Sequence, residues 1–266
     1  MKGEEIWLEV IKVRELSPLV HNITNYVVMN TTANALLAIG ASPVMAHAEE
    51  EVADMVSIAR ALVINIGTLS AHWVRSMMKA ADKASEVGIP IIVDPVGAGA
   101  TNFRTQAAKE LVEEFSPAVI RGNPSEIIAL AMGKKGTKGV DSKDPSSAAL
   151  SAGEMLAKKT GAVVCVSGEV DYVIGPTGLT AIKNGHPLMA RVTGLGCTAT
   201  ALCGAFAAVN ENYERATIAA MTVMGIAGEM AAGRASGPGS MQMHFLDALY
   251  QLSQEDVISK AKVSHV

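Results

Sequence analysis

Short runs of β-branched and other apolar residues recur along the chain, and each run ends in a small or polar residue. Four such runs, at residues 62–66, 89–93, 118–120 and 163–166, are predicted to form buried strands of a parallel sheet. Alanine-rich stretches with helical spacing lie between or beside them, at residues 71–87, 105–115 and 145–160. This alternation predicts repeated β-α-β units, and therefore an α/β fold with helices on both faces of a mostly parallel sheet.

The second half of the chain departs from this alternation. Residues 172–174 and 179–182 flank the turn sequence Gly175-Pro176-Thr177-Gly178, a pattern that predicts an antiparallel hairpin at the edge of the sheet. After Gly196 the pattern is helical almost to the end. Its segments at residues 197–209 and 215–232 are so uniformly apolar that we expect them to be deeply buried. Residues 133–144, rich in Gly, Lys and Asp, are predicted to form an exposed loop.

Composition narrows the class of protein. A chain of 266 residues without a Pro/Ser-rich linker fits one large domain over residues 1–266. Its 22 basic and 26 acidic side chains leave a formal charge of −4 and form no basic run, which argues against nucleic acid or anionic lipid as a partner. No segment reaches the ~20 apolar residues of a membrane span. The first ten residues carry three glutamates, unlike a signal peptide, so we expect a cytoplasmic protein.

Polar side chains follow the predicted strands at the points where these end. Asp94 follows one strand, Arg121 and Glu126 follow the next, and Ser167 follows the last. Because the carboxyl ends of parallel strands share one edge, where such sheets bind ligands, we expect these groups to face a common crevice. There Arg121 and Ser167 suit nucleotide phosphate, and Glu126 suits magnesium held through oxygen and bound water.

Each of these residues also has a purely structural interpretation. The sequence Asn123-Pro124-Ser125-Glu126 fits a helix start in which Asn123 caps and Glu126 reaches back to its amide. Asp94 fits a turn cap, and Ser167-Gly168 fits an ordinary turn. Three cysteines without CxxC spacing indicate neither a disulfide framework nor a zinc site.

The most informative segment is Gly194-Leu195-Gly196-Cys197, where two glycines lead into a long helix. Glycines permit close approach and unusual backbone angles, and a helix N-terminus offers unpaired N–H groups with partial positive charge, so this segment suits a phosphate. Glycines before a helix are also ordinary turn residues. No Walker A loop or GxGxxG fingerprint is present, so P-loop and nicotinamide functions lack support.

Two segments near the N-terminus carry weaker signals. Asn25 or Thr24 precedes an apolar segment and is placed to cap a helix there. Met45 lies in an extended piece after the turn at Gly40 and is placed to line an apolar pocket or the core.

Taken in order, five stretches resemble the ribokinase-like superfamily and, within it, the hydroxyethylthiazole kinase family of thiamine salvage. They are residues 21–25, 40–45, 93–98, 121–126 and 194–197. The resemblance implies a three-layer α/β sandwich that transfers the γ-phosphoryl group of ATP to the primary hydroxyl of 4-methyl-5-(2-hydroxyethyl)thiazole, with Mg²⁺ as cofactor. It also implies a homotrimer with active sites between subunits.

Position by position, the resemblance assigns the site residues to groups. It implies a catalytic anion hole at Gly194, Gly196 and Cys197, ATP contacts at Arg121 and Ser167, a magnesium site at Glu126 and Asp94, and a thiazole pocket at Asn25, Met45 and Gly194. Many sugar-kinase relatives have an aspartate base where this chain has Cys197. A free thiol has a pKa near ~8.5, so we expect Cys197 to assist without being indispensable.

Three other functions remain open at this point. A hydroxymethylpyrimidine kinase shares the Asn-Pro-Ser-Glu and Gly-Leu-Gly-Cys pieces, although residues 22–25 and 42–45 fit the thiazole enzyme better. A nucleotide-driven NAD(P)H-hydrate dehydratase shares the glycine-rich anion site, but that family usually has aspartate at the position of Cys197. A non-catalytic thiazole-binding regulator would keep the same pocket.

Overall fold

The computed structural model describes residues 1–132 and 145–266; the loop predicted at residues 133–144 lies outside this range. Within it, nine strands form one sheet in the order β2-β1-β3-β4-β5-β6-β7-β8-β9. Their bounds are β1 (Leu19–Ile23), β2 (Ser42–Val44), β3 (Ala61–Asn65), β4 (Ile91–Asp94), β5 (Val119–Gly122), β6 (Val163–Val166), β7 (Asp171–Gly175), β8 (Gly178–Ile182) and β9 (Val263–His265). The four predicted strands correspond to β3, β4, β5 and β6, shifted by at most two residues at either end except at β6, which matches.

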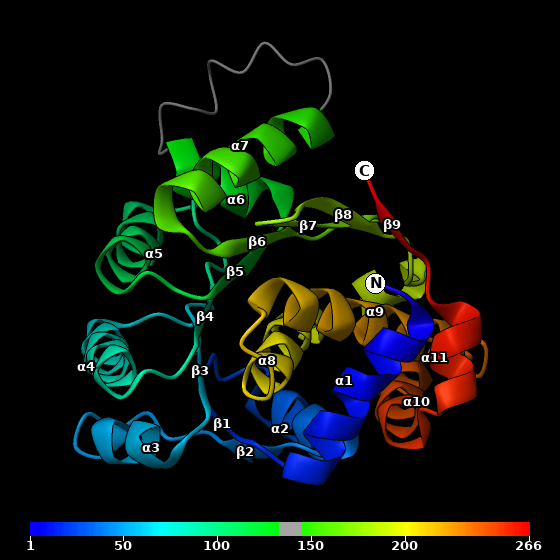
Figure 1. Cartoon of the computed structure of the whole chain (residues 1–266). Helices are drawn as coiled ribbons and strands as arrows, with labels where there is room; N and C mark the ends of the chain where they lie inside the picture. Colours follow the sequence, from blue (N-terminus) through cyan, green and yellow to red (C-terminus); the bar gives the residue numbers. More distant parts are fainter. Residues whose placement is uncertain (133–144) are drawn as a thin grey trace.

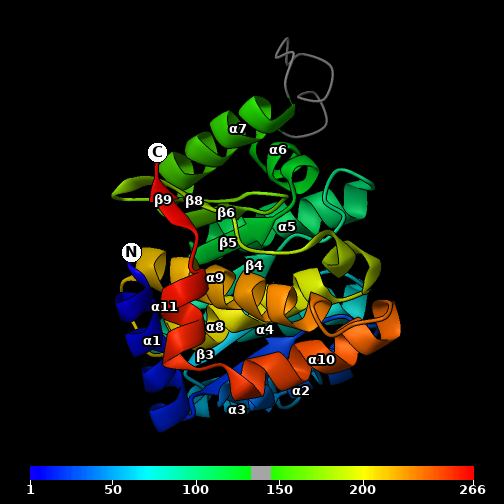
Figure 2. The same cartoon turned by 90° about the vertical axis from the view of Figure 1, so that its right-hand side faces the viewer.

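Helices cover both faces of this sheet, as predicted. Their bounds are α1 (Gly3–Leu16), α2 (Met29–Ile39), α3 (Val52–Ile58), α4 (Ala71–Val87), α5 (Asn102–Phe115), α6 (Pro124–Met132), α7 (Pro145–Thr160), η2 (Pro187–Arg191), α8 (Leu195–Ala207), α9 (Tyr213–Ala232), α10 (Pro238–Gln251) and α11 (Gln254–Lys260). One apolar core lies between the sheet and α3 to α7, and the other lies under α1, α2 and α8 to α11. Figure 1 shows the sheet between these two layers, and Figure 2 looks onto α10 and α11. The three-layer sandwich is therefore confirmed.

Neighbouring strands from β2 to β6 are parallel, and β7, β8 and β9 add antiparallel pairs. The predicted hairpin is confirmed, with Gly175 paired to Gly178 across its turn. The C-terminal strand β9, which the helical pattern after Gly196 did not predict, pairs with β8 and extends this antiparallel edge. It has three largely exposed residues and therefore no apolar pattern to detect.

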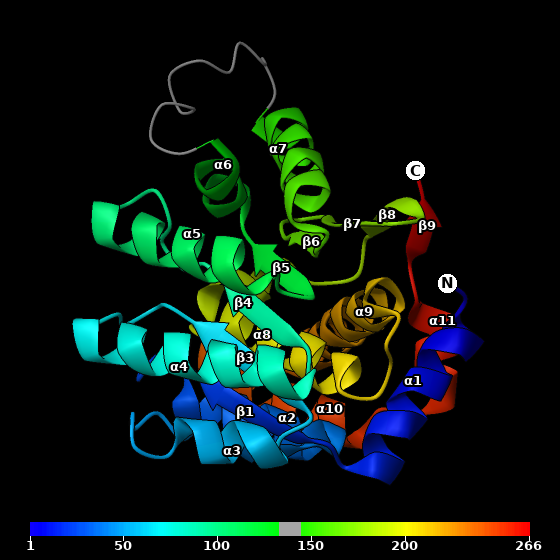
Figure 3. The same ribbon diagram turned by 60° about the vertical axis from the view of Figure 1, so that its left-hand side comes forward.

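Helix α8 lies in the centre of the molecule and carries the glycine-rich segment at its first turn. Every residue from Thr198 to Ala207 is buried, which confirms the predicted deep burial. Gly204 lets α8 approach the sheet closely, because a Cβ there would meet the Val63 side chain at 2.5 Å. Helix α8 packs against β3 and β4 (Figure 3). Its first turn lies at the edge where the parallel strands end, because Arg121 of β5 donates to the Gly196 carbonyl.

The N-terminal expectation about helix capping is wrong. Helix α2 begins at Met29 with Val28 as its N-cap, and its start has no side-chain cap bond. The side chain of Asn25 instead reaches Asn65 at the end of β3. The strand β1 that precedes Asn25 contains buried polar residues, His21 and Asn22, and these mask the apolar pattern of a strand.

Across the described ranges, none of the helices has both the length and the apolar character that crossing a membrane requires.

Candidate active site

The parallel strands place the predicted polar residues at one edge of the sheet. Asn65 and Asp94 are the last residues of β3 and β4 and pair in register. Arg121 is the next-to-last residue of β5, and Ser167 immediately follows β6. Because these four strands run side by side in the order β3-β4-β5-β6, their ends form a continuous polar rim.

The first turn of α8 closes over this rim. Gly194 is the N-cap with a left-handed φ of 85°, and the first helical bond runs from the Thr198 amide to the Gly194 carbonyl at 2.8 Å. The amides of Leu195, Gly196 and Cys197 therefore precede the helical ladder and are available to an anion. A Cβ at Gly194 would lie 2.7 Å from Cγ1 of Val28, so both the backbone angle and the packing require glycine.

Arg121 brings a positive charge to the same turn. Its Nη1 donates to the Gly196 carbonyl at 2.9 Å, and its buried Nε has no hydrogen-bond partner among the described residues. The Ser167 hydroxyl donates to the Gly122 carbonyl at 3.2 Å. Arg121, Ser167 and Gly196 all line one cleft of about 850 Å³, whose far wall includes Met221 and Met224 of α9. This cleft is large enough for a nucleotide, and the Arg121 guanidinium in its lining is a group that can pair with phosphate.

Asp94 is a buried carboxyl at the centre of the rim. Its Oδ2 accepts hydrogen bonds from Asn65 Nδ2 at 2.9 Å and from Thr200 Oγ1 at 2.7 Å. Burial raises the pKa of Asp94 to about 7, although the charge of Arg121 lowers it. The negative charge of Glu126 adds to the increase. A nearby cation would stabilise the ionised form of a carboxyl in this environment.

The contacts of Glu126 confirm the predicted capping box and leave open whether the same carboxylate also helps to hold a metal ion. Its Oε2 accepts from the Asn123 amide at 2.8 Å, while Asn123 Oδ1 accepts from the Glu126 amide at 3.0 Å, as in a capping box. Its Oε1 accepts from the Gly97 amide at 2.9 Å and so ties the loop after β4 to α6. In the described part of the chain, no group of three or more His, Cys, Asp and Glu side chains gathers closely enough to hold a metal ion alone.

Cys197 lies on the other side of the α8 turn, against Asn25. Its Sγ accepts from Asn25 Nδ2 at 3.4 Å. Burial, together with the charge of Asp94, raises the pKa of the Cys197 thiol, and hydrogen bonds from Asn65 and Asn25 only partly oppose this. The helix N-terminus therefore does not produce a thiolate, and the thiol is neutral at physiological pH.

Asn25 and Met45 lie beside the cleft rather than in its lining. Asn25 is buried next to Cys197, whereas Met45 follows the edge strand β2, which pairs with β1. The structure thus brings Asn25 together with Gly194 and Cys197 at the α8 turn, and places Met45 at the outer end of the rim. Met45 lines neither this cleft nor the hollow where β4, β5 and β6 begin.

Sequence reasoning missed three residues that hold this rim together. Asn65 bonds to both Asn25 and Asp94, and Thr200 bonds to Asp94. Arg104 of α5 donates to the carbonyls of Ile66, Gly67 and Val96, so it clamps the loops after β3 and β4. The polar Asn65 inside an otherwise apolar strand was a usable signal, whereas Arg104 and Thr200 gave none.

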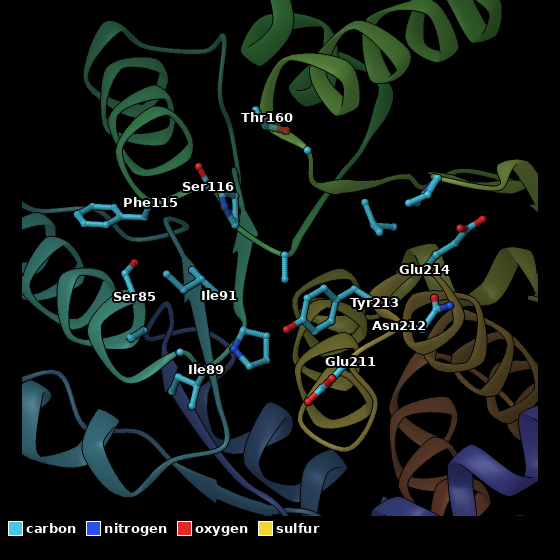
Figure 4. A pocket seen from close by; sticks show the side chains of 18 of the residues that line it. Ser85, Ile89, Ile91, Phe115, Ser116, Thr160, Glu211, Asn212, Tyr213 and Glu214 are labelled. Carbon is cyan, nitrogen blue, oxygen red and sulfur yellow. The ribbon is translucent and has the colours of Figure 1, made fainter.

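A second hollow, of about 800 Å³, opens at the opposite edge of the sheet, where β4, β5 and β6 begin (Figure 4). The carboxyl ends of α4, α5 and α7 reach it at Gly88, Ser116 and Gly161, and Glu211 and Glu214 also line it. Helix carboxyl ends and carboxylates both contribute negative charge. This hollow therefore suits an anion less well than the α8 edge does.

Comparison with known proteins gives consistent results. Residues 10–255 match the Hydroxyethylthiazole kinase family. The chain is 60% identical to a hydroxyethylthiazole kinase of Syntrophus aciditrophicus, over 98% of this chain and 97% of the other. A solved hydroxyethylthiazole kinase structure from Pyrococcus horikoshii OT3 has a TM-score of 0.90 at 48% identity, covering 98% of both chains. A ribokinase-like superfamily protein of Enterococcus faecalis, 15% identical, has a TM-score of 0.62 over 89% of this chain and 87% of the other, and shows the shared fold.

Proposed function

Because the chain belongs to the hydroxyethylthiazole kinase family, we propose that the rim at the α8 turn is where it performs that family's reaction. The reaction transfers the γ-phosphoryl group of ATP to the primary hydroxyl of 4-methyl-5-(2-hydroxyethyl)thiazole, for thiamine biosynthesis. The observation that carries the placement is the convergence of the Gly194 turn, the Arg121 guanidinium and the Asp94 carboxyl at one strand edge.

ATP enters the cleft beside Arg121 and Ser167 in this proposal. Arg121 lines this cleft and brings a positive charge to the phosphates, and the Ser167 hydroxyl lies at the end of the neighbouring strand. The transferred phosphoryl group then reaches the amides of Gly196 and Cys197. Fixed N–H dipoles at this point stabilise the charge that gathers on the phosphoryl oxygens as the bond to ADP breaks.

Glu126 and Asp94 fit a magnesium site shared with the phosphates of ATP. These two neighbouring carboxylates could bind a divalent cation together, and the cation would favour the ionised form of Asp94, whose pKa is raised. Since Oε1 and Oε2 of Glu126 already accept backbone N–H groups, we expect both residues to hold the ion largely through its bound water. Bound magnesium would neutralise phosphate charge, while the protein residues orient it.

Asn25, Met45 and Gly194 form the thiazole side, and we propose that a homotrimer completes this pocket. Two observations support the trimer. Met45 lies at the outer edge strand rather than in the cleft, and Tyr26 and Val27, directly after Asn25, are 62% and 64% exposed. An apolar surface next to a substrate residue suits contact with another subunit.

Two observations support the expected cytoplasmic location. The co-substrate is ATP, and the three cysteines of the chain are free rather than joined in disulfides.

Sedimentation equilibrium tests the trimer. We expect a mass three times the chain mass of 27.6 kDa. Val27→Glu should shift the mass toward the monomer and lower turnover, because it places a charge in the contact. Val87→Glu, at a 41% exposed valine on α4, should change neither. A monomeric wild type with full turnover would contradict the proposal.

Cys197→Ala should keep kcat within about tenfold of wild type. A base that takes the alcohol proton is worth roughly 10²- to 10⁴-fold, and a neutral thiol cannot supply that. In a loose transition state the attacking alcohol needs little deprotonation, so positioning dominates. Steady-state kinetics on a variant with wild-type circular dichroism provide the measurement. Complete loss of turnover in a folded variant would show that the thiol is essential.

ADP release from ATP, measured with and without magnesium, tests the function as a whole. Hydroxyethylthiazole and hydroxymethylpyrimidine are supplied separately, and we expect turnover with the thiazole only. Turnover with the pyrimidine only would overturn the substrate but keep the fold and chemistry. Nucleotide binding without ADP release for either alcohol would instead favour a thiazole-binding regulator.

A further inference from the structure

Asn65 lies beneath the α8 turn, and its hydrogen bonds fix the orientation of its side-chain amide. It is 2% exposed and ends β3. Its Oδ1 accepts from the Gly67 amide at 2.9 Å, and a backbone N–H can only donate, so the orientation of the Asn65 amide is fixed. The same Oδ1 accepts from Asn25 Nδ2 at 2.9 Å, and Nδ2 donates to Asp94 Oδ2 at 2.9 Å. Asn65 therefore joins three loops at the strand ends.

Asn25 rests directly on this support. Its Nδ2 carries two protons, and its two bonds, to Asn65 Oδ1 and to Cys197 Sγ, use both. Only the Oδ1 of Asn25 is then left to face a donor such as the hydroxyl of an alcohol. Gly67 supports the amide from below, because a Cβ there would lie 2.6 Å from Asn25 Nδ2.

The support itself is held rigidly. Arg104 donates to the Gly67 carbonyl at 2.6 Å and to the Ile66 carbonyl at 3.0 Å, in the loop that follows Asn65. Another bond from Arg104, at 2.7 Å, reaches the Val96 carbonyl beyond Asp94. Two partners of the Asn65 side chain, Gly67 and Asp94, thus lie next to carbonyls that Arg104 holds, which leaves this side chain little freedom to move. It can therefore determine the direction of its neighbours.

We propose that Asn65 is the positioning residue for the acceptor alcohol: it fixes the Asn25 amide so that Asn25 Oδ1 points at the thiazole hydroxyl. This rests on the proposed function, since it assigns Asn25 to the alcohol side. Asn65 acts on the alcohol through Asn25. It also donates to Asp94 Oδ2 on the nucleotide side, but Thr200 donates to the same oxygen, so Asp94 keeps a donor when Asn65 is removed. Removal of Asn65 should therefore affect the alcohol substrate far more than ATP binding.

The test is a double-mutant cycle of Asn65→Ala, Asn25→Ala and the double variant, with kcat and KM measured for the thiazole and for ATP. We expect Asn65→Ala to lower kcat/KM for the thiazole by about tenfold to a hundredfold, as for one or two lost hydrogen bonds in a buried site. The KM for ATP should stay within about twofold. In the Asn25→Ala background, Asn65→Ala should have almost no further effect on kcat/KM.

Two further variants separate positioning from general destabilisation. Asn65→Leu fills the same space without the hydrogen bonds, so it should be as impaired as Asn65→Ala. If the defect of Asn65→Ala came only from the cavity that alanine leaves, Asn65→Leu would restore the activity. Thr217→Val removes a buried hydroxyl bond on α9, far from the rim, and should reduce the melting temperature without changing thiazole kinetics. In addition, Gly67→Ala pushes on Asn25 from below and should reproduce the thiazole defect.

Three outcomes would overturn the assignment: multiplicative effects of Asn65→Ala and Asn25→Ala, an ATP KM that rises as much as the thiazole KM, or wild-type kinetics in folded Asn65→Leu. Failure of the proposed function is distinguishable, because the wild-type protein would then show no thiazole turnover before any variant is compared.

Discussion

Asp94→Asn should lower kcat by about a hundredfold to a thousandfold while the protein remains folded. Asparagine retains an oxygen that can accept from Asn65 and Thr200, so the hydrogen-bond network at the strand ends survives. What is lost is one negative charge beside Arg121 and Glu126, and with it part of the hold that we propose for the magnesium ion that would neutralise phosphate. Removing one preorganised electrostatic group from an active site commonly costs about 10²- to 10³-fold. Steady-state kinetics over a magnesium titration provide the measurement.

The same variant should be more stable than wild type at pH 8 without magnesium. The pKa of Asp94 is about 7 in the folded protein, against 3.8 ordinarily, so the unfolded chain releases this proton more readily. Wild-type stability therefore falls as pH rises from about 4 to about 7, and Asp94→Asn lacks this decrease. Melting temperatures of both proteins should coincide near pH 4 and separate by pH 8. Equal melting temperatures at pH 8, or kcat within tenfold of wild type, would show that the Asp94 charge has little role.

Thr200→Ser serves as the control for Asp94→Asn. Serine keeps a hydroxyl that can donate to Asp94 Oδ2 and leaves the charge in place, so kcat should stay near wild type. If Thr200→Ser loses as much activity as Asp94→Asn, packing around the carboxyl, rather than its charge, explains both effects.

The strand ends were predictable from the sequence because the signal is local. Each apolar run had to stop where the chain left the sheet, and parallel topology then placed Asp94, Arg121 and Ser167 on one edge. The glycine-rich turn before α8 was readable for a similar reason, since only glycine suits the left-handed angle at Gly194.

Contacts between distant segments were not readable in this way. Asn25 looked like a helix cap from its neighbours in sequence, yet its amide bonds to Asn65, forty positions away, and to Cys197. The state of Cys197 depended on burial by elements that the local sequence does not contain. A helix N-terminus alone lowers a thiol pKa, but burial and Asp94 reverse the sign here.

Glu126 shows that a structural and a functional interpretation need not compete. Its carboxylate forms the capping box that the sequence predicted and also binds the loop that follows Asp94. The cap fixes the carboxylate at the strand edge, where a cation held through water would need it. Evidence for a cap is therefore no evidence against a metal site in this family of folds.

Gly194→Ala should abolish most of the activity, with a loss in kcat of about a hundredfold or more. Alanine at a φ of 85° costs roughly 1–2 kcal/mol in backbone strain. Its Cβ would also lie 2.7 Å from Cγ1 of Val28, so the α8 turn must move. The amides of Gly196 and Cys197 move with it, and misplacing even one such donor costs about 10²- to 10³-fold. Phosphoryl-transfer kinetics and thermal melts measure the two effects separately.

Gly88→Ala separates backbone strain from displacement of the turn. Gly88 ends α4 with a φ of 77°, and nothing lies within 4 Å of a Cβ built there. This variant should lose about as much stability to strain as Gly194→Ala does, but keep wild-type kcat. In the double variant, Val28→Ala removes the atom that collides with the Cβ introduced by Gly194→Ala, so it should recover part of the activity without relieving the strain. If Val28→Ala gives no recovery, the defect comes from the backbone angle alone, and the packing of α2 against the α8 turn does not position the phosphoryl group.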